Sequence, residues 1–564
     1  MRLRGLIGIA VAAALVAACT RSLPPRGEAL VVVDTDVPVP EYAGRMRLDV
    51  YSADGTVWTE SRETTLRSPS DWPASFSLYT DDDMTAHQAL LRIRVFRDGE
   101  TRDYRGERFT SRAPTSTPSA DAFPASPSCD PPSDCELPRF IRGNLDLTPP
   151  TEPHPYLAID RLVRLRLVPG VRGKVVLTLH GACIGTMADM QSLATCIDTD
   201  AEQSAVPDAV LDPDMTIPAP IAKDFGGPQP CPSTATPRNG HLVGGTRLFD
   251  EELCVPGGTY VFGSPGASQL DTTSTLPRRV ATVPPFLMDK YEVTVGRWRA
   301  ALAKGFKPKV PAVANPLPLS RDTCSPPRAG SNAWCTYTAT PRVPEDRETY
   351  ALSCVDWQSA RDFCRFEGGD LPSEAQWEWV AQAVGRTAKT TWPWGNEDPG
   401  CGEGDAPDTE GWMAFKRLWE CSYSWYHVGN CIKTSGAVCT DGKGYMTGCF
   451  APAVLNARQG PHPSDETDVP GGDRSYLLGI VNLAGGLEEY TLDSLLPLRS
   501  QCWASAPIVS PVCLDPATPQ HTLRGDALDG IGYGSSARRA LQQNDRESNP
   551  PEVGFRCVRP VETP

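Results

Sequence analysis

The chain is 564 residues long, with 40% hydrophobic residues and a formal net charge of −15. This length exceeds what one hydrophobic core organises, so two or three domains are expected. The acidic balance and the lack of clustered Lys and Arg argue against a nucleic-acid partner, because phosphate contacts need basic patches.

The first residues have the pattern of an export signal. Arg2 and Arg4 give a positive start, and residues 6–16 form an apolar stretch that is too short to span a bilayer comfortably. Small residues lead from there to Cys19. We therefore predict a signal peptide over residues 1–18.

Residues 16–19, of sequence Val-Ala-Ala-Cys, resemble the lipobox of bacterial lipoproteins. In that family a diacylglycerol is attached to the cysteine and the signal is cut just before it. The resemblance implies a lipid on Cys19, a tether over residues 19–28 and attachment to a membrane. The alternative is an ordinary secretory signal with a chance cysteine, and under both interpretations the protein is exported.

Thr20, rather than aspartate, follows the cysteine. In enterobacterial lipoproteins this residue favours the outer membrane. We therefore expect a protein anchored in the cell envelope, with the outer membrane favoured over the inner one.

The remaining 18 cysteines are an even number in a chain that leaves the reducing cytosol, which permits up to nine disulfides. Zinc is the competing interpretation. The cysteine spacings are irregular, no paired C-x-x-C occurs, and the seven histidines are scattered. Disulfides therefore fit the pattern better than zinc.

The number of cysteines on each side of residue 250 also predicts a pairing. Five cysteines beyond Cys19 precede this point and thirteen follow it, so at least one bridge crosses it if all of them pair. The shortest such bridge lies between the end of one segment and the start of the next. The expected bridges are Cys231–Cys254 across the boundary, with Cys129–Cys135 and Cys183–Cys196 as local ones.

Alternation of apolar and polar residues dominates the first half, as in Leu91 to Phe96, and predicts half-buried strands. We expect a β-sandwich-like region over residues 29–205, with a Pro/Ser-rich insertion at 110–138. One sandwich and two small β-domains both remain open. A Pro-rich stretch over residues 206–245 predicts a linker.

After residue 246, tryptophans, glycines and short helical patterns replace the alternating strands. Asp356 is placed to cap the N-terminus of a helix. Ser373 and Gln376 have the spacing of a capping box, and Trp377 begins an apolar stripe. The pattern predicts two short amphipathic helices in a loop-rich domain.

Five landmarks in this half occur in the order found in one known family. Together they resemble the formylglycine-generating enzyme, or sulfatase-modifying factor, domain. The resemblance covers residues 246–560 and implies an irregular α+β fold related to C-type lectins. The landmarks are Gly257 to Ser264, Met288 to Thr294, Leu371 to Trp379, Trp392 to Asn396, and Gly554 to Cys557.

Active members of that family are oxidases that bind copper through two nearby cysteines and convert a sulfatase cysteine into formylglycine. The corresponding stretch here, residues 524–539, contains no cysteine. Cys502 and Cys513 lie upstream and are better interpreted as a disulfide than as a displaced copper site. Because Cu(I) requires soft thiolates, we expect no copper and a non-catalytic domain.

A second family feature is present in part. Residues 482–490 resemble a segment that helps to hold calcium in the family, which implies Asn482, the Gly485 carbonyl and Glu489 as ligands. Gly486 and Tyr490 replace the usual asparagine and tryptophan. A purely structural turn is the equal alternative.

Cys324 begins a Cys-x-Pro-x-Arg pattern of the kind that such oxidases recognise in sulfatases. Nothing around it resembles a sulfatase, so we interpret the pattern as chance, with Cys335 as an ordinary disulfide partner.

Three functional hypotheses remain. The first is a surface-anchored module that binds a protein or a glycan, with the insertion between Cys401 and Gly472 as one location for a binding surface. The second is a copper-dependent oxidase, and the third is an envelope scaffold without a ligand.

Overall fold

The computed structural model describes much of residues 26–561, with gaps at 81–83, 104–139, 199–201, 264–277, 320–334, 387, 397–437, 441–445, 449–462, 466–467, 469–472, 499, 526–538, 541–550 and 552. The chain divides into two compact units, one ending at Phe225 and the other beginning at Gly226. In the described part of the chain, no helix is long and apolar enough to cross a membrane. Cys19, Cys129 and Cys135 lie outside the described residues.

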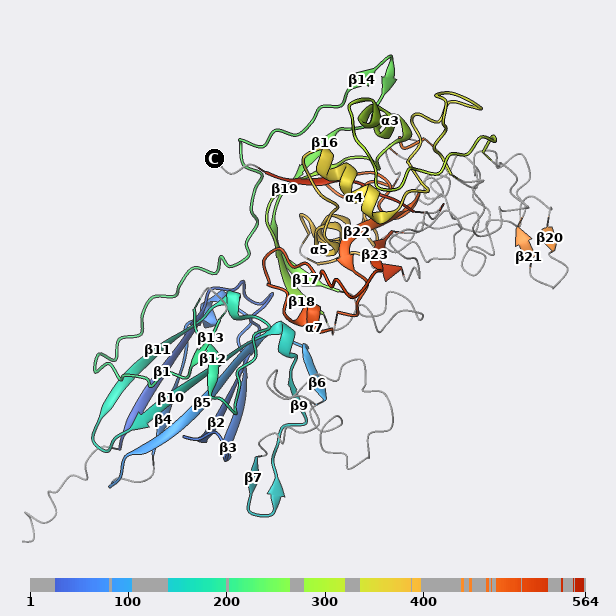
Figure 1. Cartoon of the computed structure of the whole chain (residues 1–564). Helices are drawn as coiled ribbons and strands as arrows, with labels where there is room; N and C mark the ends of the chain where they lie inside the picture. Colours follow the sequence, from blue (N-terminus) through green and yellow to red (C-terminus); the bar gives the residue numbers. More distant parts are fainter. Residues whose placement is uncertain are drawn as a thin grey trace, which may run out of the picture. The chain divides into compact units, whose positions relative to one another are not determined.

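The first unit consists mainly of strands (Figure 1). They are β1 (Glu28–Thr35), β2 (Arg45–Ser52), β3 (Trp58–Thr65), β4 (Ala74–Tyr79), β5 (His87–Phe96), β6 (Thr101–Asp103), β7 (Ile141–Arg142), β8 (Leu145–Asp146), β9 (Thr151–Pro153), β10 (Ala158–Leu167), β11 (Arg172–Leu179), β12 (Ala194–Cys196) and β13 (Gln203–Ala205).

Two sheets organise this unit, with strand orders β11-β1-β4 and β10-β5-β2-β3. Strands from before and after residues 104–139 share both sheets, because β1 pairs with β11 and β5 pairs with β10. The strands on the two sides of the expected insertion therefore belong to one β-rich unit.

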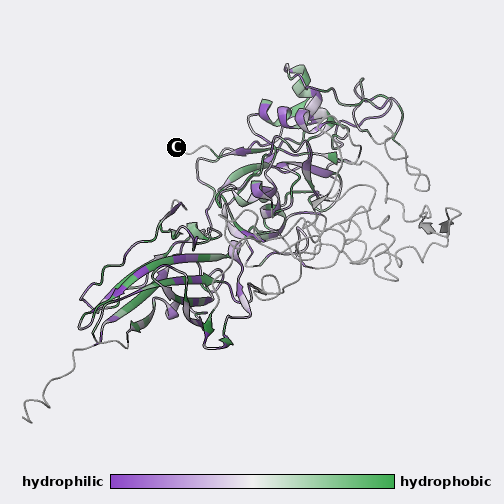
Figure 2. Ribbon diagram, turned by 60° about the horizontal axis from the view of Figure 1, so that its bottom comes forward, coloured by the Kyte–Doolittle hydropathy of each residue, from purple (hydrophilic) through white to green (hydrophobic). Residues whose placement is uncertain are grey.

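The alternating strand at Leu91 to Phe96 is buried on both faces rather than on one. Arg92 and Arg94 are 8% and 5% exposed, because the carboxylates of Asp160 and Asp49 pair with them, each at 2.6 Å. Figure 2 shows hydrophobic and hydrophilic residues along the long strands of this unit. The polar positions thus form buried ion pairs, which the alternation alone does not reveal.

The stretch expected as a linker is not a free spacer. Its first part is bound to the first unit, where the Asp34 carboxylate accepts hydrogen bonds from the backbone N–H of Ile221 and from Lys223. Its second part belongs to the second unit, where Arg238 pairs with Glu252 at 2.6 Å. Proline therefore marks an extended segment held by side chains, not a flexible one.

The second unit contains short strands and helices with long irregular connections (Figure 1). The strands are β14 (Leu242–Val243), β15 (Thr246–Arg247), β16 (Glu252–Val255), β17 (Gly258–Phe262), β18 (Arg279–Val283), β19 (Phe286–Asp289), β20 (Val438–Thr440), β21 (Met446–Gly448), β22 (Glu488–Ser494), β23 (His521–Arg524), β24 (Arg539–Ala540), β25 (Val553–Gly554) and β26 (Val558–Pro560). The helices are α3 (Val295–Ala303), α4 (Trp357–Phe366), α5 (Glu374–Glu378) and α7 (Gln501–Ala504), and a π-helical turn over Trp379–Ala383 follows α5.

The predicted helix starts are confirmed. The Asp356 side chain accepts a hydrogen bond from the backbone N–H of Ser359 at the start of α4. At α5, Ser373 and Gln376 form the expected reciprocal capping box. Local sequence therefore sets where these helices begin.

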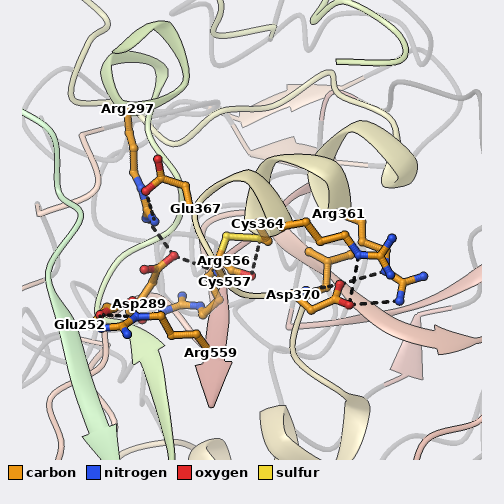
Figure 3. The surroundings of a disulfide bond; sticks show 12 residues. Glu252, Asp289, Arg297, Arg361, Cys364, Glu367, Asp370, Arg556, Cys557 and Arg559 are labelled. Atoms are coloured by element: carbon orange, nitrogen blue, oxygen red, sulfur yellow. Dashed lines mark hydrogen bonds and ion pairs between the residues drawn. A yellow bond between two sulfur atoms is a disulfide. The ribbon is translucent and has the colours of Figure 1, made fainter. Parts of the chain in front are cut away.

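A disulfide between Cys364 and Cys557 joins α4 to the last strand region, and the two cysteines are 193 positions apart in the sequence (Figure 3). Next to it, the Asp289 carboxylate accepts hydrogen bonds from Arg297 and from the backbone N–H of Cys557, both at 2.8 Å. Arg559 pairs with Glu252 at 2.7 Å. The end of the family-like region is therefore fixed by a covalent bond and by ion pairs.

The predicted bridges Cys183–Cys196 and Cys231–Cys254 are present, and the predicted Cys129–Cys135 bridge lies outside the described residues. The second does not join two units, because both of its cysteines lie after Gly226. The domain boundary falls earlier than the cysteine count assumed. This bridge instead fastens the Pro-rich segment to β16.

Candidate functional site

The candidate site lies around Arg556, which follows β25 and is fully buried. Its Nη2 is 2.5 Å from the Glu489 Oε1 atom, and the same nitrogen donates to the Val481 carbonyl at 2.8 Å. Trp377 of α5 donates its ring N–H to Glu489 Oε2 at 2.9 Å. Two of the five landmarks that carry the family resemblance, Leu371 to Trp379 and Gly554 to Cys557, therefore meet at the buried carboxylate of Glu489.

The loop before β22 is held by carboxylates on both sides. Asp473 accepts the backbone N–H groups of Ala484 and Gly485 at 2.8 and 2.9 Å. Glu292 accepts the backbone N–H of Leu487 at 3.2 Å and the side-chain amide of Asn482 at 3.1 Å. These bonds fix the loop that contains Asn482 and Gly485, two of the three predicted calcium ligands.

Burial changes the acidity of these two carboxyl groups. It raises the pKa of Glu292 to about 8, with the nearby Glu489 charge as the next cause. Burial also raises the pKa of Asp473 to about 7, although the two backbone N–H groups lower it. Both groups therefore favour the protonated form more than an exposed carboxyl does.

The charges at this site do not balance when all groups are ionised. Glu292, Asp473 and Glu489 carry three negative charges, and Arg556 carries one positive charge among them. Asp473 Oδ1 and Ser464 Oγ are buried and have no hydrogen-bond partner in the described part of the chain. Such a site is completed by protons, by water or by a cation.

The three residues predicted to bind calcium differ in how they are used. Asn482 and Gly485 lie in the loop before β22. Both carboxylate oxygens of Glu489, in contrast, accept hydrogen bonds from Arg556 and Trp377. Among the described residues, no group of three or more His, Cys, Asp or Glu is arranged to hold a metal ion. Glu489 thus fits an ion pair better than a calcium ligand, and calcium binding stays a prediction.

Glu292, Asp473 and Ser464 belong to this site although the sequence pattern does not predict them there. Glu292 lies within a family landmark, but nothing in its neighbours indicates burial. Asp473 and Ser464 lie in a Gly- and Pro-rich stretch that resembles an exposed loop. Only their contacts with residues 482–487 reveal their role.

The segment expected to correspond to the copper site begins at Arg524, which is also fully buried. Arg524 pairs with Glu374 at 3.1 Å and with Glu378 at 2.7 Å, and its guanidinium lies 5.2 Å from the Trp377 ring centroid. Residues 526–538 lie outside the described residues. The described part of the segment is therefore an ion-pair cluster.

Every cysteine with a described side chain is part of a disulfide. Cys502 and Cys513 are bonded to each other, as expected from the sequence. Cys335 is bonded to Cys354, so the pairing suggested with Cys324 is wrong. Cys354 is the preferred partner because it lies just before α4, where the fold brings it against Cys335. Cys324 itself lies outside the described residues.

Residues 243–561 match the family described as the sulfatase-modifying factor enzyme 1-like domain. The chain belongs to this family. Among curated proteins, the formylglycine-generating enzyme of Thermomonospora curvata is 26% identical over 167 residues, which are 26% of this chain and 52% of that protein. The matched region thus spans about half the length of this relative.

Three solved structures are also similar to the chain. PvdO from Pseudomonas aeruginosa is 16% identical with a TM-score of 0.32, and the match covers 55% of this chain and 94% of PvdO. Treponema denticola variable protein 1 is 13% identical with a TM-score of 0.30, covering 57% and 98%. CarF is 12% identical with a TM-score of 0.29, covering 55% and 98%. The family assignment rests on the match to the sulfatase-modifying factor family.

Proposed function

We propose that the protein is an exported lipoprotein, anchored in the cell envelope through Cys19, whose sulfatase-modifying factor domain binds a protein or glycan ligand or has a structural role, without catalysing oxidation. The first unit connects the anchor to this domain. The C-type-lectin relation that the sequence resemblance implies is part of the proposal, because that type of fold presents variable loops from a rigid frame.

The observation that carries the non-catalytic proposal is the absence of thiols where copper chemistry needs them. No cysteine occurs in residues 524–539. Cys502 and Cys513, the only pair suggested as a substitute, are joined in a disulfide. A disulfide sulfur cannot serve as a thiolate ligand for Cu(I).

Metal analysis of the purified, oxidised protein tests this proposal. After exposure to copper and removal of loosely bound metal, the protein is expected to retain no stoichiometric copper. A variant with Cys502→Ser and Cys513→Ser should behave identically, because neither cysteine is a ligand. Copper retained by the unmodified protein and lost in that variant would support the alternative, a copper-dependent oxidase acting on sulfatase cysteines.

Calcium is proposed as an optional ligand of the same domain, with Asn482, Gly485 and Glu489 as the ligands that the family resemblance implies. The buried oxygens of Asp473 and Ser464 support a cation in this region, whereas the Arg556 contacts of Glu489 weigh against Glu489 as a ligand. If calcium binds the folded state, it raises the melting temperature by mass action. An unchanged melting temperature with excess calcium or with chelator would leave the segment as a structural turn.

The anchor has its own test. Mass spectrometry of the mature N-terminus should find acyl groups on Cys19 and no residues 1–18. A free N-terminus at Thr20 or beyond would contradict the anchor and leave only export.

A further inference from the structure

Strand β4 lies at the edge of one of the two main sheets of the first unit (Figure 1). The strand order of this sheet is β11-β1-β4, so β1 is the central strand and β4 has one side that faces away from it. Among the described residues, no strand pairs with that side of β4. We call it the β4 edge, comprising residues 74–79.

The pairing with β1 shows which backbone groups of β4 point to this edge. Thr80 donates its N–H to the Gly27 carbonyl at 3.4 Å, and hydrogen-bonded positions of an antiparallel pair recur at every second residue. On the other side of β1, Glu28 donates its N–H to the Val171 carbonyl at 3.0 Å, which fits the same alternation. The positions that direct N–H and C=O groups to the β4 edge are therefore those between the positions bonded to β1. They are Ser75, Ser77 and Tyr79, whose side chains are exposed.

The other edges of the two main sheets have the protection that strand edges usually have. The Pro-rich segment forms backbone bridges to Lys174 of β11 and to Arg164 of β10. Three of the eight residues of β3 are charged. In contrast, β4, of sequence Ala-Ser-Phe-Ser-Leu-Tyr, carries no charge. Because charges and covering segments keep an edge from pairing with another chain, a bare and uncharged β4 edge favours such pairing.

The sequence of β4 is complementary to itself. When two copies pair antiparallel about Ser77, Ser75 of each copy lies opposite Tyr79 of the other, so the outward N–H and C=O groups meet. On the other face of the strand, Phe76 lies opposite Leu78. Both of these side chains are half-buried in the single chain, and the pairing covers apolar surface that they still expose. No charged side chain of one strand meets a like charge of the other.

We propose that two copies of the chain form a symmetric dimer through the β4 edge, in which their sheets continue as one. Two-fold pairing suits a strand that is complementary to itself, because the same residues serve on both sides. The contact is small, since each copy contributes six residues, so the dimer is weak and forms at high local concentration. It depends neither on the lipid anchor nor on the ligand proposed above. Such a dimer joins two sulfatase-modifying factor domains, which bind a ligand with repeated sites more tightly than one domain does.

Photo-crosslinking of the full chain tests the pairing and its register. A photoreactive benzoylphenylalanine introduced at Ser75 should give a covalent dimer, with the crosslink at Tyr79 or an adjacent residue of the other copy. Mixing isotope-labelled and unlabelled chains separates crosslinks between copies from crosslinks within one. The same photoreactive residue at Thr65, an exposed position on β3, is the control and should give no dimer. A dimer crosslinked only outside residues 74–80, or a crosslink only to a different protein, would overturn the proposal.

Two proline substitutions provide a matched pair. Ser77→Pro removes an outward N–H and breaks no bond to β1, so it should lower the yield of the Ser75 crosslink roughly tenfold through lost hydrogen bonds between the copies. Thr65 also directs its N–H outward, because its neighbour Leu66 donates to the Gly44 carbonyl at 2.9 Å. Thr65→Pro should therefore leave the yield unchanged.

Circular dichroism checks that both proline variants fold. If Ser77→Pro does not fold, Ser77→Lys replaces it, because two like charges at the centre of the paired strands should lower the yield in the same way. Equal crosslink yields in the unmodified chain and in a folded Ser77 variant would overturn the dimer.

Discussion

The two units balance their buried charges in different ways. In the first unit, Arg92 and Arg94 each have a carboxylate partner on a neighbouring strand. In the second unit, three carboxylates gather around the single guanidinium of Arg556. Regular strands satisfy most of their own backbone, so the buried Arg92 and Arg94 can pair with carboxylates of neighbouring strands. The irregular unit uses buried carboxylates to hold loop N–H groups, and it thereby accumulates negative charge.

The units also differ in covalent support. Among the described residues, the first unit contains one disulfide, Cys183–Cys196, and the second contains four. A disulfide stabilises a fold mainly by restricting its unfolded chain, and it does so more when it closes a longer loop. The comparison predicts that side-chain networks and disulfides matter more in the second unit than in the first.

The largest effect is expected from Arg556→Ala. The change leaves Glu489 buried without its partner and should lower the free energy of unfolding of the second unit by about 3–5 kcal/mol. Arg62→Ala is the control, because its partner Glu60 is exposed and such pairs contribute about 0–1 kcal/mol. Urea unfolding followed by tryptophan fluorescence measures both. Equal losses in the two variants would contradict a central role for the buried pair.

Removal of the Cys364–Cys557 bridge should be the next most damaging change. The double serine variant should destabilise the second unit by about 2–5 kcal/mol, because this bridge closes a loop of 193 residues. The matched Cys183→Ser and Cys196→Ser pair closes only 13 residues and should cost the first unit less. Differential scanning calorimetry resolves the two transitions. The comparison between units would fail if the short bridge proved the more important one.

A smaller effect concerns pH. The folded state raises the pKa of Glu292 to about 8, above that of an exposed glutamate, so the folded state holds a proton that the unfolded state releases. Its stabilising contribution is complete below the unfolded pKa and is lost as pH rises through the folded one. Stability of the second unit should therefore fall by about 1–3 kcal/mol between pH 6 and pH 9. Glu292→Gln should flatten this slope, and an unaltered slope would exclude Glu292 as its source.

The smallest expected effect is local. Asp356→Ala removes the N-cap of α4 and should cost about 1 kcal/mol. Asp356→Asn keeps an acceptor for the N–H of Ser359 and should retain most of the stability. Thermal melting of both variants checks this prediction. A loss as large as that of Arg556→Ala would show that local caps, not buried networks, support the unit.

Features set by neighbouring residues could be predicted from the sequence. The helix caps at Asp356 and Ser373 depend on residues three positions away. The Cys231–Cys254 bridge was predicted from the number of cysteines on each side of residue 250. Features set by distant residues could not. The burial of Arg94 depends on Asp49 in another strand, and the site at Glu489 depends on Arg556, 67 positions further along the chain. Ion pairs between residues that are distant in the sequence can be recognised only in the folded structure.

The direct test of the account is conversion of a Cys-x-Pro-x-Arg peptide by the purified, copper-treated protein under oxygen. An active formylglycine-generating enzyme serves as the positive control, and disulfide mapping of the same sample checks that Cys502 and Cys513 remain bonded. Mass spectrometry of the peptide should show unmodified cysteine, because every cysteine with a described side chain in the second unit is in a disulfide and residues 524–539 contain none. Formation of formylglycine in proportion to the protein added would contradict the account.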